Sequence, residues 1–214
     1  NGLKNDENYV LISQGCVNNC SFCSIKAAKG AVVSRPADDI LADIKSAASG
    51  VVTLLADDCG SYGLDIGSDL PHLLRRALDS FPRVRIKISS LYPGAFVKMF
   101  GALAPLFATG RIVYANIPLQ SGSSTVLRSM GRVYDIDRVL KCVRRVKKLS
   151  PGTWLYTHIM INFPAETRTD FMKSLKASLC FDERMFIQYS DNPGTRSAGI
   201  VPKVANPEGR RRLA

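Results

Sequence analysis

Short apolar runs alternate with longer amphipathic stretches along most of this chain, and that alternation limits the folds open to it. Six apolar runs have the length of strands: Tyr9–Ser13, Val51–Ala56, Val84–Ser89, Ile112–Leu119, Trp154–Ile161 and Met185–Tyr189. Five stretches between them have the length and breakers of helices: Ala37–Ala48, Asp69–Ser80, Gly94–Phe107, Ile136–Leu149 and Thr169–Leu179. This order predicts an α/β fold, either an open doubly wound sheet or a partial barrel, with its chemistry at the carboxyl ends of the strands.

The charge balance favours an anionic partner. Lys and Arg number 29 against 18 Asp and Glu, which leaves a formal charge of +11. Neutralised phosphates release counterions, so nucleic acid is the first candidate, and a basic surface without a partner is the alternative. No apolar run reaches the roughly 18 residues that span a bilayer, so we expect no membrane partner. Asn1 is not an initiator Met, so we expect a piece of a longer protein or a processed chain.

Three cysteines lie within eight residues immediately after the first expected strand. They are spaced C-x3-C-x2-C, as Cys16, Cys20 and Cys23, in a polar loop. Six cysteines in all are too few for a secreted disulfide scaffold, so we expect a reducing compartment and a cytoplasmic protein. A closed zinc site needs four ligands, whereas three thiolates on a [4Fe–4S] cluster leave one iron open to a reacting ligand. A zinc site completed by a remote residue and three unrelated core cysteines are the alternatives.

This cysteine spacing, at the end of the first β/α unit, resembles the signature of the radical S-adenosylmethionine (SAM) superfamily. The resemblance implies a partial (β/α)6 TIM-like barrel of the radical SAM type. It also implies that SAM chelates the open iron through its amino and carboxylate groups. An electron from the reduced cluster then splits the C5′–S bond, giving methionine and a 5′-deoxyadenosyl radical that abstracts hydrogen from the substrate.

Further motifs resemble the radical SAM domain of the methylthiotransferases, which modify tRNA adenosines and, in one branch, a ribosomal-protein aspartate. The matching segments are Ser34-Arg35-Pro36, the Asp57–Ile66 turn, Ile117–Ser123, Val126–Met130 with Arg132, Phe163–Thr167 and Tyr189–Thr195. The resemblance covers roughly residues 9 to 198. We therefore expect a radical SAM core domain over residues 1–198, and a polar basic tail or the start of a missing domain over residues 199–214.

The resemblance assigns Cys16, Cys20 and Cys23 to the cluster. It places Phe22, the residue before the last cysteine, near the SAM adenine, and the alternative for Phe22 is an ordinary buried aromatic side chain.

Five polar residues are assigned to SAM in the same way. Asp57 and Asp58 follow the second expected strand and are expected near the SAM amino group, which a carboxylate accepts in a charge-assisted hydrogen bond. Gln120 and Ser121 are expected at the ribose hydroxyls or the methionine carboxylate. Arg132 is expected to pair with that carboxylate, since a guanidinium fits it bidentately. The alternative for each residue is a role in a turn or a helix cap.

The chain departs from the family pattern in places that bear mainly on the substrate. The family's Gly-Phe-Pro-Gly-Glu-Thr reads here from Asn162 to Thr167, with Asn162 and Ala165 in place of the two glycines. Those glycines bear on how the backbone approaches SAM. The segment Lys26–Gly30 also lacks the Pro and Arg that are common after the cysteines. The family's basic-Pro-Gly-Thr pattern near the sixth expected strand reads Asp191-Asn192-Pro193-Gly194-Thr195 here.

The expected function is the catalytic core of a tRNA methylthiotransferase that converts an adenosine C–H into C–SCH3. Partners are then tRNA and a reductant such as flavodoxin or ferredoxin. The family's second [4Fe–4S] cluster and its RNA-binding barrel belong to domains that we expect outside this chain. The segment Ile66–Pro71 resembles the threonylcarbamoyl-adenosine branch. The alternatives are a radical SAM enzyme acting on a peptide or ribosomal protein, and an RNA-binding module with a structural metal.

Hydrolase and ATPase chemistry have no support in the sequence. His72 and His158 are the two histidines, no nucleophile elbow surrounds a serine, and no Walker phosphate loop is present. His158 lies in an apolar strand and is expected to be a core residue. The remaining cysteines, Cys59, Cys142 and Cys180, have no ligand spacing and are expected to be small core or loop residues.

Overall fold

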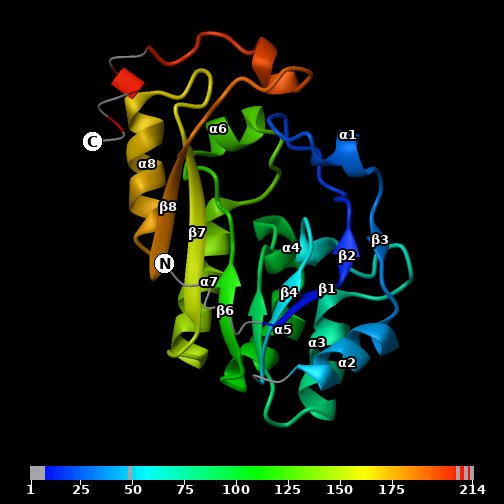
Figure 1. Ribbon diagram of the computed structural model, residues 1–214. Helices are drawn as coiled ribbons and strands as arrows, with labels where there is room; N and C mark the ends of the chain where they lie inside the picture. The colour runs from blue at the N-terminus through cyan, green and yellow to red at the C-terminus, as the bar shows by residue number, and fades with distance from the viewer. Residues whose placement is uncertain (1–7, 48–49, 206–207, 210–211, 213–214) are drawn as a thin grey trace.

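Six parallel strands form one sheet at the centre of the molecule, a computed structural model that describes residues 8–47, 50–205, 208–209 and 212 (Figure 1). In sheet order the strands are β1 (Asn8–Leu11), β4 (Val51–Leu55), β5 (Arg85–Ile88), β6 (Ile112–Asn116), β7 (Trp154–Ile161) and β8 (Glu183–Gln188). Every neighbouring pair is parallel. Within the described chain β1 and β8 each have one neighbour, so the sheet stays open at both edges, as the expected partial barrel requires.

Helices connect successive strands and pack against one another along the sheet. They include α2 (Ala37–Ser46), α3 (Leu70–Ser80), α4 (Pro93–Lys98), α5 (Phe100–Ala108), α7 (Ile136–Leu149) and α8 (Arg168–Ser178). The remaining elements are α1 (Ile25–Lys29), α6 (Ser124–Ser129), the antiparallel pair β2 (Ser13–Gln14) and β3 (Val33–Ser34), and two 3-10 turns at Cys59–Ser61 and Arg196–Gly199. Neighbouring helices α2, α3, α5 and α7 contact each other in that order, which places them on one side of the sheet (Figure 1).

Helix α7 shows how the sequence pattern is realised. Its apolar stripe is buried, with Val139, Val143 and Val146 fully enclosed. The Asp135 carboxylate caps its first turn by accepting from the Asp137 amide at 2.9 Å. The basic residues of the opposite side, Arg138, Lys141, Arg145 and Lys148, are exposed. The interpretation of that side as a solvated outer face is confirmed.

Two expected elements are interrupted for local reasons. The expected strand Ile112–Leu119 ends at Asn116, because Pro118 has no N–H for the ladder. Pairing then returns as a single bridge between Gln120 and Ile159. The expected helix Gly94–Phe107 divides into α4 and α5 at Met99, whose φ of −93° and ψ of 3° leave the helical range. The two halves pack against different neighbours, α4 on α7 and the Cys59–Ser61 turn, α5 on α3 and α7.

The first expected strand, Tyr9–Ser13, leaves the sheet two residues before its expected end. Strand β1 stops at Leu11, and Ser13 pairs instead with Ser34 of β3 in a separate antiparallel ribbon. Ala48, the expected end of the helix Ala37–Ala48, and parts of the expected segments 1–198 and 199–214 lie outside the described residues. No helix in the described part of the chain is long and apolar enough to cross a membrane.

Candidate metal centre

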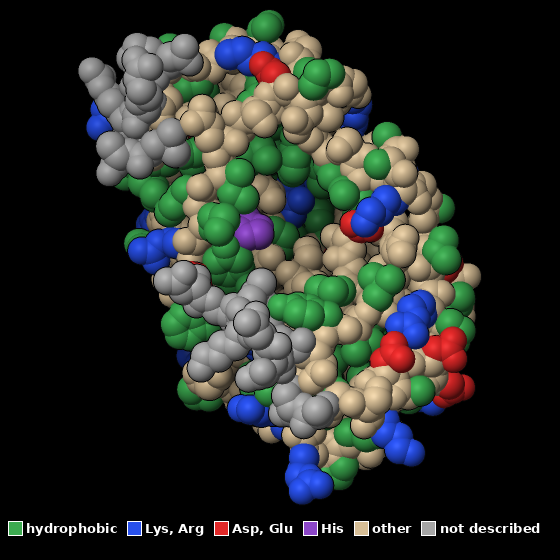
Figure 2. Space-filling view, in the orientation of Figure 1, with side chains coloured by type: hydrophobic (Ala, Val, Ile, Leu, Met, Phe, Trp, Pro, Cys, Tyr) green, Lys and Arg blue, Asp and Glu red, His purple; other side chains and the backbone are tan. Residues whose placement is uncertain are grey.

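The three clustered cysteines lie in the loop between β2 and α1, beside the carboxyl ends of the strands (Figure 1). Cys16 and Cys20 are half-buried, Cys23 is exposed, and all three are free thiols. On the face shown in Figure 2 the molecule is hollowed between the two edges of the sheet, with hydrophobic side chains around the hollow. The loop is thus an accessible rim rather than part of the hydrophobic core, which argues against three unrelated core cysteines.

The donor set fits an iron–sulfur cluster better than one metal ion. Among the described residues, no three Cys, His, Asp or Glu side chains lie close enough together to hold a single ion. A zinc site draws its ligands tightly round one atom, whereas each thiolate of a cubane cluster binds a different iron. A zinc site completed by a remote residue thus has no preformed ligand group among the described residues. Three thiols on one loop, with no fourth ligand nearby in the described chain, suit a [4Fe–4S] cluster with one open iron.

Two of the three thiols have raised pKa values. Burial raises the pKa of Cys16, and hydrogen bonds from Asn18 lower it in part. Burial also raises the pKa of Cys20, which the adjacent Arg132 guanidinium opposes. Both thiols are therefore protonated at neutral pH without metal, and binding of a cluster must release those protons.

Asp57 and Asp58, expected at the SAM amino group, both bond to the cysteine loop. The buried Asp58 carboxylate accepts four hydrogen bonds, from Asn18 Nδ2, the Gly60 and Tyr92 amides, and the Ser61 hydroxyl. Asn18 Nδ2 also donates to Cys16 Sγ at 3.3 Å. Four bonds occupy the lone-pair sites of one carboxylate, an arrangement that suits the turn role.

Asp57 ties the start of the cysteine loop to the end of β4. One oxygen accepts from the Gly15 amide at 2.9 Å, and the other pairs with Lys29 Nζ at 2.9 Å. Donors from the described residues take two of its four lone-pair sites, so a further donor can be accommodated.

Gln120 and Ser121 are neighbours in the loop after β6, but their side-chain oxygens differ in hydrogen bonding. Gln120 adopts a left-handed backbone with φ of 66°, and its Oε1 is buried without a hydrogen-bond partner in the described structure. The fully buried Ser121 hydroxyl lies 3.1 Å from Ser174 Oγ and accepts from the Ser123 amide. Gln120 thus offers an unused acceptor, whereas Ser121 joins this loop to α8.

Arg132 and Phe22 also reach the site. The Arg132 side chain is buried, with Nη1 3.5 Å from Cys20 Sγ and Nη2 donating to the Pro118 carbonyl at 2.7 Å. Phe22 is half-buried and packs edge-to-face on Phe163, with ring centroids 6.4 Å apart. This contact suits both the expected adenine neighbour and an ordinary aromatic core residue.

The turn after β7 has left-handed backbone at both positions where this chain replaces a glycine of the family pattern. Asn162 and Ala165 have φ values of 62° and 63°, in the left-handed region that glycine adopts most easily. Asn162 is a favoured non-glycine residue there, because its short side chain can bond locally, whereas Ala165 has no such compensation. This turn thus carries two non-glycine side chains at left-handed positions.

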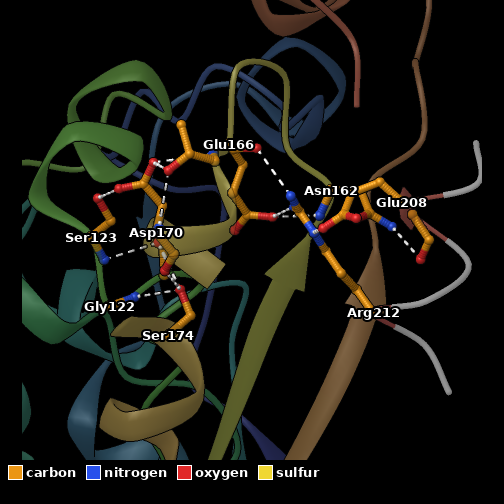
Figure 3. A network of polar contacts seen from close by, with 11 residues as sticks. Gly122, Ser123, Asn162, Glu166, Asp170, Ser174, Glu208 and Arg212 are labelled. Atoms are coloured by element: carbon orange, nitrogen blue, oxygen red, sulfur yellow. Dashed lines mark hydrogen bonds and ion pairs between the residues drawn. The ribbon is translucent and has the colours of Figure 1, made fainter. Parts of the chain in front are cut away.

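Glu166 lies at the end of this turn, and no role was predicted for it from the sequence. Its fully enclosed carboxylate accepts from the Asn162 amide at 2.8 Å and pairs with Arg212 Nη1 at 2.7 Å (Figure 3). Burial raises the pKa of Glu166 to about 6, although the Asn162 amide and Arg212 lower it in part. The partners are 46 positions apart, so no local sequence pattern could have paired them.

The segment after β8 also covers the same turn. Pro202 O accepts from the Ala165 amide at 2.8 Å, and Gly209 O accepts from Asn162 Nδ2 at 3.3 Å. A cavity of about 390 Å³ opens beneath it, lined by Asn162, Gln188, Tyr189, Asp191, Lys203, Val204 and Gly209. This places a cavity at the carboxyl ends of β7 and β8, the end of the sheet where the sequence predicted the chemistry.

Comparisons with known proteins agree with this geometry. The tRNA-2-methylthio-N(6)-dimethylallyladenosine synthase of Salinispora arenicola is 33% identical over 207 residues, covering 93% of this chain and 41% of the relative. The Leifsonia xyli protein of the same name is 35% identical over 216 residues, covering 96% of this chain and 40% of the relative. The chain thus spans about two fifths of the length of these curated relatives.

Solved structures of low identity share the fold. Coproporphyrinogen III oxidase (HemN) from Escherichia coli has a TM-score of 0.64 at 16% identity, over 97% of this chain and 50% of that one. Methylornithine synthase (PylB) has a TM-score of 0.59 at 15% identity, over 91% and 56%. The family model of the Radical SAM superfamily matches residues 10–177. These matches confirm the expected fold class and the superfamily's cofactors, a [4Fe–4S] cluster and SAM. The chain belongs to the radical SAM superfamily.

Proposed function

We propose that this chain is the catalytic core of a methylthiotransferase that acts on a tRNA adenosine. The observation that carries the proposal is the 33–35% identity, over 93–96% of this chain, to proteins named tRNA-2-methylthio-N(6)-dimethylallyladenosine synthase. Those names favour dimethylallyladenosine over the threonylcarbamoyl-adenosine suggested by Ile66–Pro71. Because the chain spans only about two fifths of those relatives, methylthiolation is proposed for the whole protein, with a second cluster and RNA-binding surfaces outside this chain.

We assign different roles at the site to different residues of this chain. We assign Cys16, Cys20 and Cys23 to the cluster, which when bound supplies the electron that splits SAM into methionine and a 5′-deoxyadenosyl radical. Cys16 and Cys20 release their protons on binding the cluster, and Asp58 positions the loop through Asn18. The free acceptor sites of Asp57 suit the SAM amino group.

Gln120, Phe22 and Arg132 complete the proposed SAM site. The unpartnered Gln120 Oε1 suits a ribose hydroxyl, because a buried acceptor without a donor is costly until a ligand supplies one. Phe22 offers an aromatic edge to the adenine, and Arg132 a positive charge to the carboxylate. The +11 charge suits tRNA. An external reductant of the flavodoxin or ferredoxin type and a cytoplasmic location complete the proposal.

The first test is iron binding by the isolated chain. Anaerobic protein reconstituted with iron and sulfide is expected to hold one four-iron cluster, with a broad absorption that dithionite bleaches. Cys16→Ala, Cys20→Ala and Cys23→Ala are each expected to lose most of that iron, because three thiolates are the minimum set for this cluster. Cys142→Ala is the matched control, a half-buried cysteine outside the loop, and is expected to keep it. One bound zinc and no iron would instead support the structural-metal alternative.

The second test concerns the substrate and uses the full-length protein that contains this chain. Reduced protein with SAM and undermodified tRNA is expected to yield a methylthiolated adenosine, detected by mass spectrometry of nucleosides. Ribosomal proteins incubated in parallel serve as the comparison. A methylthiolated peptide with unmodified tRNA would refute tRNA as the substrate while leaving the radical SAM assignment in place.

A further inference from the structure

Arg132 is a buried cation with no carboxylate partner among the described residues. It follows α6, and its side chain is buried. None of the ion pairs between described residues includes it. Two aromatic rings flank the guanidinium, Tyr92 at 4.7 Å and Tyr134 at 5.5 Å from the ring centroids. The rings and one carbonyl oxygen provide partial negative charge, but not a full countercharge.

A cysteine of the metal-binding loop lies within reach of this cation and is the neighbour that becomes an anion when it binds iron. Arg132 Nη1 lies 3.5 Å from Cys20 Sγ, within hydrogen-bond reach of a sulfur acceptor. The pair is 112 positions apart in sequence, and the Ser21 amide and hydroxyl, donating to the carbonyls of Met130 and Ser129, hold the two segments together. A buried charge is costly unless it is paired. The thiolate that Cys20 becomes on binding iron would provide that pairing.

We infer that Arg132 is the charge partner of the cluster and raises its reduction potential through the Cys20 sulfur. The inference rests on the proposed function in its assignment of a cluster to Cys16, Cys20 and Cys23. Three thiolates on a cluster core of charge +2 leave a net negative charge, and reduction adds one more electron. A fixed positive charge nearby favours the more negative, reduced form. An N–H donor on a ligand sulfur acts in the same direction, because it draws electron density from the cluster.

This role is separable from the pairing with the SAM carboxylate expected from the sequence. The Nη1 and Nη2 atoms already point to Cys20 and to the Pro118 carbonyl, and Nε is buried without a partner. A residue that acts only through SAM changes nothing until SAM is bound. A charge partner of the cluster changes its potential in the absence of SAM.

The test is a reductive titration of the reconstituted chain without SAM, followed by electron paramagnetic resonance of the reduced cluster. Arg132→Gln, which removes the charge, is expected to shift the midpoint potential to a more negative value, and Arg132→Lys is expected to shift it less. Arg128→Gln is the matched control, because Arg128 is exposed on α6 and the charge change is the same. It is expected to leave the potential unchanged. An Arg132→Gln cluster with the wild-type potential would overturn the inference.

A second measurement does not depend on a variant that removes the charge. Chain labelled with 15N-arginine and reduced without SAM is expected to show a 15N coupling to the cluster spin in pulsed spectra. That coupling is expected to disappear in Arg132→Lys. A cluster without any 15N coupling overturns the inference but leaves the proposed function standing. A chain that binds no iron at all refutes both.

Discussion

Ala165 gives the sharpest test of the turn after β7. An L-residue with Cβ in the left-handed region is disfavoured by roughly 1–2 kcal/mol, and φ at Ala165 is 63°. Glycine relieves that strain but costs roughly 0.5–1 kcal/mol more in conformational entropy on folding. The Ala165 side chain is exposed, so no burial is lost, and its amide keeps the bond to the Pro202 carbonyl. Ala165→Gly is therefore expected to raise the free energy of unfolding by about 1 kcal/mol.

The measurement is urea unfolding of the isolated chain, followed by circular dichroism, with a thermal melt beside it. For a chain of this size a gain of about 1 kcal/mol corresponds to roughly 2–4 °C in Tm. Ala102→Gly is the matched control, an exposed alanine inside α5 with right-handed helical backbone. There the same substitution is expected to lower the free energy of unfolding by about 1 kcal/mol, since glycine is a poor helix former. Both variants make the same substitution at an exposed alanine, one in a left-handed turn and the other in a right-handed helix.

The outcome that would refute the reasoning is a loss of stability in Ala165→Gly similar to that of Ala102→Gly. In that case Ala165 would have an ordinary backbone, and the turn would not follow the path of the family's glycine-bearing pattern. The positions that Glu166 and Pro202 take around it would then have to be reconsidered, because both bond to backbone atoms of the turn.

Two further predictions concern Glu166 in this turn and Gly122 in the loop that packs against α8. Burial raises the pKa of Glu166 from 4.5 to about 6, so the folded state binds this proton more tightly than the unfolded state does. The contribution of that proton to the free energy of unfolding is complete below pH 4.5 and is lost as the pH rises through 6. The unfolding free energy of the wild type, measured against that of Glu166→Gln, is expected to fall by about 2 kcal/mol across this interval, and a difference independent of pH would contradict it. In Gly122→Ala the added Cβ would lie 2.3 Å from the Lys173 carbonyl oxygen, so overpacking is expected to cost roughly 1–3 kcal/mol in urea unfolding. Gly152→Ala, which has open space, is the control, and equal stability of the two variants would show that α8 does not pack against this loop.

The fold was predictable where long-range packing and local pattern agree. Trp154–Ile161 and Ile136–Leu149 have the boundaries expected from the sequence, because continuous apolar character and a clear helical stripe both extend to their ends. Short elements were not predicted. Helices α1 and α6 and the ribbon of β2 and β3 are two to six residues long, too short for a period to be recognised.

The cysteines of the candidate site could be predicted from the sequence, but the contacts that hold their loop could not. The spacing of Cys16, Cys20 and Cys23 is local, so the sequence displays it directly. The contacts that hold the loop join distant positions: Asn18 and Asp58 are 40 residues apart, and Arg132 and Cys20 are 112 apart. No alternation or spacing records such pairs, because they arise only when the strands align. The assigned roles of Phe22, Gln120 and the other SAM residues stay predictions.

The cysteine loop is held by three segments that are remote from one another in sequence. The end of β4 holds it through Asp57 and Asp58, the end of α6 holds it through the bond from the Ser21 amide to the Met130 carbonyl, and the Ser197 amide donates to Ser21 O. Each bond removes conformational freedom from the loop before any cluster arrives. Less of the binding free energy of the cluster is then spent on ordering the loop. The 3-10 turn containing Ser197 leads directly to Pro202, whose carbonyl accepts from the Ala165 amide in the turn after β7. One segment therefore contacts both the cysteine loop and the turn after β7.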